Sequence, residues 1–176
     1  MKIIIVTGMP GAGKEEFLSV ADSMGIPFAR MGDAVRELYP SSAECKNGLS
    51  VGQFANAERE RHGKNIWAKR TIERMSGSLF LVDGCRSMDE VRSFRELSGD
   101  VRIIGIHSPP ELRYKRLIER GREDAPKSAA EFEERDLREI SWGLAVVIAM
   151  ADIMIVNTSS LGDFRSASEK ILRELR

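Results

Sequence analysis

The feature that most constrains this chain is a glycine-rich stretch near its start, Gly8-Met-Pro-Gly-Ala-Gly-Lys14, which fits the pattern G-x-x-x-x-G-K. A predicted strand at 2–7, apolar from Ile3 to Val6, precedes the stretch, and residues 14–24 repeat apolar side chains at helical spacing. This order of strand, loop and helix is typical of a phosphate-binding loop, because backbone N–H groups and the helix N-terminus surround the phosphate while Lys14 adds a point charge. We predict that nucleotide phosphates contact Gly8, Pro10, Gly11, Ala12, Gly13 and Lys14.

The rest of the chain alternates between short β-rich runs and amphipathic segments. We expect further strands at 26–30, 79–82, 101–107 and 153–156, and this alternation favours a parallel sheet with helices on both faces. A chain of 176 residues is long enough for one compact domain and short for two. The sequence therefore predicts a single α/β domain over residues 1–176, a three-layer P-loop NTPase fold with a five-stranded parallel sheet. The polar stretch 40–50 is expected to be an irregular connection.

Charge and composition exclude several classes of protein. Lysine plus arginine equals aspartate plus glutamate at 27 each, so the chain lacks the overall basic field that favours nonspecific nucleic-acid binding. No apolar run approaches the roughly 20 residues that span a bilayer, and the two cysteines, Cys45 and Cys85, lack metal-site spacing. We expect a cytoplasmic protein with neither nucleic-acid nor membrane partners, present as a monomer or a homodimer.

The residue after the loop lysine departs from the usual pattern. Phosphate loops of this type carry Ser or Thr there to hold Mg²⁺, whereas this chain has Glu15. A carboxylate can bind Mg²⁺ directly, but it also brings negative charge next to the phosphates. Either Glu15 rebuilds the metal site or it weakens catalysis. Asp83 is the second expected metal ligand, because it ends an apolar run at the carboxyl edge of the sheet; its alternative role is a turn residue before Gly84.

Together with the phosphate loop, three further motifs resemble the nucleoside monophosphate kinase group, close to adenylate kinases and dephospho-CoA kinases. The resemblance is closer still to an archaeal family of adenylate-kinase-related proteins, and it covers nearly the whole chain. The motifs are Met31-Gly-Asp-Ala-Val-Arg36, Asp83-Gly-Cys-Arg86 and Ala151-Asp-Ile-Met-Ile-Val-Asn157. The second lacks the proline that usually precedes its arginine.

The resemblance implies a role for each motif. It implies that Arg36 holds the acceptor's phosphate, that Asp83 serves the metal, that Arg86 touches the acceptor and that Asn157 lies near adenine. Asp33 belongs to the acceptor motif, and it is our one candidate for a base if the acceptor is a hydroxyl.

The resemblance also implies two insertions, an acceptor-binding lobe over about 38–77 and a lid over about 116–140. We place Arg59 in the lobe, although Arg61 is an alternative, and Arg120, Arg122 and Arg135 in the lid. Arginine forks bind phosphate bidentately, which is what phosphoryl transfer requires. The same arginines, spaced beside glutamates, also describe a solvated helix face.

These features predict a small-molecule kinase that uses ATP and Mg²⁺. The ATP γ-phosphoryl group would pass to a nucleotide-like acceptor, either a nucleoside monophosphate or dephospho-CoA. Lys14, Asp83, Arg120 and Arg122 would act in the transfer step. One alternative is a nucleotide-binding regulator or sensor with little turnover, in which Glu15 has replaced the metal-binding hydroxyl. Another is a P-loop NTPase that acts on water.

Overall fold

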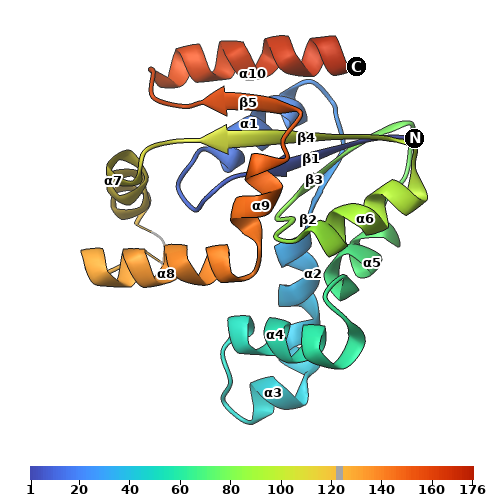
Figure 1. Ribbon diagram of the computed structural model, residues 1–176, viewed down its shortest axis with the longest axis vertical. Coiled ribbons are helices and arrows are strands. Elements are labelled where there is room, and N and C mark those ends of the chain that lie inside the picture. Colours follow the sequence, from blue (N-terminus) through green and yellow to red (C-terminus); the bar gives the residue numbers. More distant parts are fainter. Residues whose placement is uncertain (122–124) are drawn as a thin grey trace.

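The computed structural model describes residues 1–121 and 125–176. Its centre is a five-stranded, entirely parallel sheet with strand order β2-β3-β1-β4-β5 (Figure 1). The strands are β1 (Lys2–Thr7), β2 (Phe28–Arg30), β3 (Leu79–Asp83), β4 (Asp100–His107) and β5 (Ile153–Val156). The predicted α/β fold with five parallel strands is confirmed. The predicted second strand was two residues too long, because regular pairing with β3 begins only after Pro27, at Phe28.

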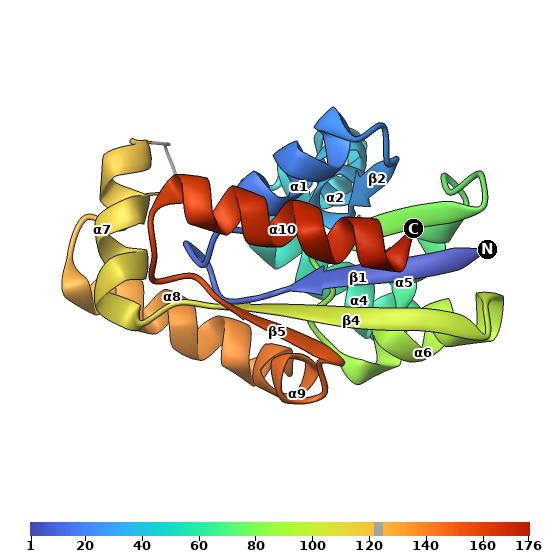
Figure 2. The same ribbon diagram turned by 90° about the horizontal axis from the view of Figure 1, so that it is seen from above.

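Helices cover both faces of the sheet, as the three-layer prediction required. They are α1 (Lys14–Ser23), α2 (Met31–Leu38), α3 (Ala43–Lys46), α4 (Val51–His62), α5 (Ile66–Ile72), α6 (Met88–Leu97), α7 (Pro110–Arg120), α8 (Ala129–Ser141), α9 (Leu144–Ala149) and α10 (Leu161–Leu175), with a 3-10 turn at Tyr39–Ser41. Figures 1 and 2 show α1 and α10 together on one face, while α2, α5, α6 and α9 cover the other.

The two core layers follow from the two-residue period of the central strand. Ile3 and Ile5 point into the layer that contains Trp67 of α5, whereas Ile4 and Val6 point into the layer beneath α1 and α10. All four β1 side chains are fully buried. A central parallel strand buried on both faces reads as a continuous apolar run, which is why it was visible in the sequence.

Capping residues set several helix starts. Ser87 and Glu90 form a capping box at the start of α6, and Ser128 accepts a hydrogen bond from the backbone N–H of Glu131 at the start of α8. Asp33 is the third residue of α2, which begins at Met31. The stretch 40–50, expected to be irregular, contains part of the 3-10 turn and α3.

No helix within the described residues is long and apolar enough to cross a membrane.

Candidate functional site

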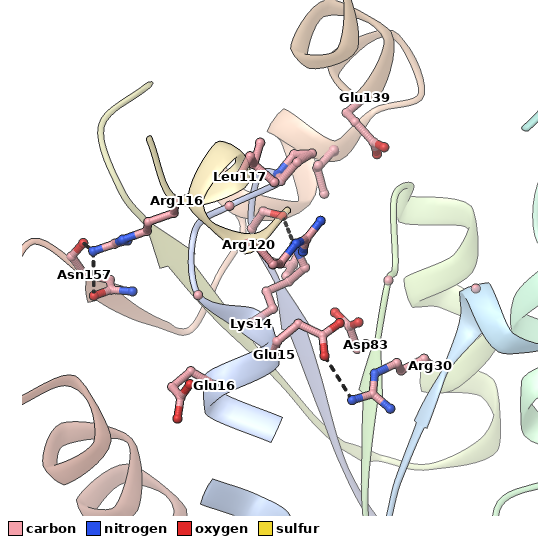
Figure 3. Close-up of a pocket in the computed structure, with 18 of the residues that line it drawn as sticks. Lys14, Glu15, Glu16, Arg30, Asp83, Arg116, Leu117, Arg120, Glu139 and Asn157 are labelled. Carbon is pink, nitrogen blue, oxygen red and sulfur yellow. Dashed lines mark hydrogen bonds and ion pairs between the residues drawn. The ribbon is translucent and has the colours of Figure 1, made fainter. Parts of the chain in front are cut away.

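A cleft of about 640 Å³ opens at the carboxyl edge of the sheet, where ligands of open parallel sheets bind. Figure 3 shows that its side chains come from α1, the strand ends and α7, with Glu139 reaching in from α8. The predicted site residues among its lining are Gly8, Pro10, Gly11, Gly13, Lys14, Glu15, Arg36, Asp83, Arg86, Arg120, Arg135 and Asn157. The fold thus gathers most of the predicted residues into one cleft.

The phosphate loop has a backbone shape that favours glycine at several of its positions, among them Gly11 and Gly13. Gly11 and Gly13 have φ values of +80° and +115°, in the left-handed region. A Cβ on Gly11 would lie 2.7 Å from the carbonyl oxygen of Arg113, and one on Gly13 would lie 2.3 Å from Asn157 Nδ2. The loop therefore has no room for side chains at these glycines. Lys14 begins α1, and its Nζ donates to the Gly8 carbonyl at 2.6 Å.

Asn157 supports the loop from the end of β5. Its side chain is 6% exposed, and its Nδ2 donates to the Ala12 carbonyl oxygen at 2.8 Å. Its own carbonyl accepts from Arg116 at 3.2 Å. Ala12 is itself buried, so it contributes backbone to the loop rather than a surface to the cleft. In this structure Asn157 fixes the loop, and the predicted contact with adenine stays a prediction.

A buried arginine that was not predicted holds the loop from the other side. Arg113 of α7 donates to the Pro10 carbonyl at 3.1 Å and to the Ser108 carbonyl at 3.1 Å. It also forms a bidentate ion pair with Asp136 of α8, at 2.9 and 2.5 Å. This pair links the phosphate loop to both helices of the predicted lid.

Lys14 and Asp83 form the electrostatic centre of the cleft. Burial lowers the pKa of Lys14, and the negative charge of Asp83 opposes that change. Burial likewise raises the pKa of Asp83, against the positive charge of Lys14. Asp83 Oδ1 is buried and has no hydrogen-bond partner among the described residues. A buried carboxylate oxygen of this kind needs a cation or a donor, because leaving it unpaired costs free energy.

These features fit Mg²⁺. Mg²⁺ is usually held by one or two carboxylates together with substrate phosphates and water. Asp83 and Glu15 would therefore be enough ligands from the protein. The described residues contain no cluster of three or more carboxylate, cysteine or histidine ligands. A metal here would therefore depend on the nucleotide phosphates for the rest of its ligands.

Glu15 lies opposite an arginine that sequence reasoning missed. Its Oε2 is 3.2 Å from Nη2 of Arg30, the last residue of β2 (Figure 3). Arg30 lines the cleft and is paired in register with Asp83 on the neighbouring strand. Its place at the carboxyl end of a predicted strand, directly before the acceptor-like motif, was the signal that was available in the sequence.

The residues predicted to bind the acceptor are only partly brought together. Arg36 lines the cleft and pairs with Asp33 at 2.5 Å, but Asp33 itself borders a second, smaller hollow beside β2. Arg86 lines the cleft and pairs with Glu139 at 2.7 Å. Arg59 is not among the lining residues; its guanidinium packs over the ring of Trp142, 5.5 Å from the centroid, and lies 3.7 Å from Glu90.

The predicted lid contributes arginines from two helices. Arg120 of α7 and Arg135 of α8 line the cleft, as does Arg116. Arg122 lies outside the described residues. Positive charge therefore reaches the phosphate loop from α7 and α8 as well as from α2 and the loop after β3.

The fold and the phosphate loop define a P-loop domain of the AAA type. Residues 4–139 match the model of the AAA domain family, and the chain belongs to that family. Solved structures that share the fold include two kinases. A shikimate kinase from Bacteroides thetaiotaomicron aligns with a TM-score of 0.64 at 16% identity, over 99% of this chain and 97% of that one. A gluconokinase from Sinorhizobium meliloti 1021 gives 0.62 at 16% identity, over 99% and 93%.

Within that class, the chain belongs to the UPF0200 family. A UPF0200 protein of Thermoplasma volcanium is 42% identical over 171 residues, which cover 97% of this chain and 96% of that protein. A UPF0200 protein of Hyperthermus butylicus is 42% identical over 176 residues, with coverage of 98% and 94%. The predicted resemblance to P-loop kinases and to an archaeal family is confirmed.

Proposed function

We propose that this protein is a kinase that transfers the γ-phosphoryl group of ATP to a small nucleotide or nucleotide-like acceptor. The observation that carries the proposal is the position of Asp83 beside the phosphate loop: its charge raises the pKa of the half-buried Lys14, and its buried Oδ1 has no partner among the described residues. Phosphoryl transfer needs little covalent chemistry from the protein, but it needs positive charge and exact placement around the moving group. The cleft supplies both.

In this proposal the backbone N–H groups of residues 8–14 hold the donor phosphates, and Lys14 offsets the negative charge on the phosphate oxygens between donor and acceptor. Mg²⁺, when bound, would spread the phosphate charge, with Asp83 and Glu15 as its protein ligands. Arg36 and Arg86 would anchor the acceptor. They approach from α2 and from the loop after β3, on the side of the cleft away from β5.

The lid arginines complete the arrangement. Arg120 and Arg135 line the same cleft from α7 and α8, where they would screen charge on the transferring group and exclude water. The ion pair of Arg113 with Asp136 joins these two helices, and Arg113 also bonds to the phosphate loop, so both lid helices are anchored to the loop. Residues 38–77, which contain α3, α4 and α5, are our proposed acceptor-binding lobe.

The acceptor can have either of two chemistries. A nucleoside monophosphate supplies a phosphate oxygen as the nucleophile and needs no base. A hydroxyl acceptor benefits from a base, and Asp33 would serve only if its ion pair with Arg36 opened toward the cleft. Two proteins of the same fold carry the names shikimate kinase and gluconokinase, so hydroxyl acceptors belong in the test.

The test is a transfer assay with Mg·ATP and a panel of acceptors, in which mass spectrometry detects the phosphorylated product. The panel contains AMP, CMP, UMP, GMP, the deoxynucleoside monophosphates, dephospho-CoA, shikimate and gluconate. We expect one acceptor to give product well above the control without acceptor. Lys14→Met should lower that rate by about 100-fold or more, whereas Lys170→Met, an exposed lysine on α10, should leave it unchanged. Tight nucleotide binding without transfer to any acceptor would refute the kinase.

A second candidate function is a nucleotide-binding regulator with little turnover. The observation in its favour is the ion pair of Glu15 with Arg30, which occupies the carboxylate that would otherwise serve the metal. Glu15→Ser separates the two candidates. If the regulator is correct, restoring the hydroxyl raises transfer sharply. If Glu15 is a working metal ligand, the same change leaves transfer unaltered or lowers it.

A further inference from the structure

Glu15 and Arg30 come together only in the folded chain. Glu15 is in the first turn of α1, and Arg30 is the last residue of β2. Both side chains line the cleft, with exposed fractions of 47% for Glu15 and 30% for Arg30. The pair therefore belongs to the wall of the phosphate site rather than to the outer surface, where such pairs contribute little.

Packing fixes the position of Arg30. Its guanidinium lies over the ring of Phe28, 4.8 Å from the centroid, and its backbone is paired in register with Asp83. Its Nε is buried and has no hydrogen-bond partner among the described residues. Leaving a buried donor unpaired costs free energy, so local packing alone does not account for an arginine at this position.

The charges around the loop explain why an arginine is needed there. Three carboxylates, Asp83, Glu139 and Glu15, raise the pKa of Lys14 against the effect of burial. One lysine cannot neutralise these carboxylates and also attract the phosphates of a nucleotide. Arg30 is ion-paired with Glu15, and it joins Lys14 and Arg86 in lowering the pKa of Asp83.

We propose that Arg30 is a phosphate-site residue that neutralises Glu15, so that the loop keeps its affinity for nucleotide phosphates although a carboxylate replaces the usual hydroxyl. Glu15 and Arg30 then act as one unit. Losing Arg30 alone weakens phosphate binding, and losing Glu15 alone strengthens it. This inference depends on the proposed function only in that the loop binds a nucleotide; it does not require transfer to an acceptor.

The test is a double-mutant cycle on ADP binding, measured by isothermal titration calorimetry in EDTA so that no metal ion contributes. Removing the arginine in Arg30→Gln should weaken ADP binding by roughly tenfold or more, the size expected for one uncompensated charge beside a phosphate. Glu15→Gln should strengthen it. Glu15→Gln with Arg30→Gln should restore an affinity within about threefold of the wild type, because the pair carries no net charge.

Two further variants separate charge compensation from other roles of the arginine. Arg30→Lys keeps the charge without the planar fork, so it should bind ADP nearly as well as the wild type. Arg173→Gln is the matched control, since Arg173 pairs with Glu169 at 2.6 Å and neither residue lines the cleft. It should leave ADP affinity unchanged. Far-UV circular dichroism of each variant checks that the fold is retained.

Three results would overturn the inference. In the first, the double variant binds ADP as weakly as Arg30→Gln, which would mean that Arg30 contacts phosphate directly. In the second, Arg30→Gln binds ADP like the wild type. In the third, the wild-type chain does not bind ADP, which would overturn the proposed function as well. A wild type that binds ADP, shows rescue in the cycle and transfers to no acceptor would refute the kinase and leave the role of Arg30 standing.

Discussion

Gly13→Ala should destabilise the phosphate loop, because the new side chain would strain the backbone and collide with Asn157. Gly13 has φ +115°, and a Cβ there would lie 2.3 Å from Nδ2 of Asn157. The strained backbone costs about 1–3 kcal/mol. Asn157 would also have to move and give up its hydrogen bond to Ala12, and an unpaired buried acceptor costs about 1–3 kcal/mol. We expect an unfolding free energy lower by about 2–6 kcal/mol.

Urea unfolding followed by far-UV circular dichroism measures this loss, with Gly25→Ala as the control. Gly25 also has a positive φ, +69°, but a Cβ there meets nothing within 4 Å. That variant should therefore lose only the backbone component, about 1–2 kcal/mol. It should also leave ADP binding intact, while Gly13→Ala reduces it.

The contact with Asn157 is tested by a second substitution. If the clash is the cause, Asn157→Ala removes the obstructing amide, and the double variant should lose less stability than the two single losses together. Equal losses for Gly13→Ala and Gly25→Ala, or strictly additive losses in the double variant, would refute this reasoning.

Two further predictions concern buried charges. Asp136→Ala leaves Arg113, whose side chain is only 4% exposed, without its ion partner, so urea unfolding should show an unfolding free energy lower by about 3–5 kcal/mol. The control, Arg173→Ala, breaks an exposed ion pair. A comparable loss in that control would contradict the argument. The pKa of Asp83 is raised in the folded state, so the native state stays protonated to higher pH than the unfolded chain. The stability that this group contributes therefore falls as pH rises above 3.8, the ordinary pKa of an aspartate. The unfolding free energy of Asp83→Asn minus that of the wild type should therefore increase with pH, by at most about 1.4 kcal/mol per unit; a decrease would show a lowered pKa instead.

Much of the fold could be predicted because its signals are local. The buried central strand is apolar on both faces, so Ile3 to Val6 form an unbroken run, and the glycines that follow allow the backbone to turn around a phosphate. The capping pair Ser87 and Glu90 is likewise encoded within four residues. The short helix α3 was missed because its four residues have no measurable period.

What the sequence by itself determined is therefore the α/β class, the five strands and the phosphate loop with Lys14 and Asp83 at the edge of the sheet. Each of these depends on residues that are neighbours along the chain. Only the tertiary structure decided which distant charges meet: Glu15 with Arg30, Arg113 with Asp136, and Arg59 with Glu90. The physical reason is that an ion pair depends on distances between side chains, and packing of separate elements, rather than sequence spacing, sets those distances.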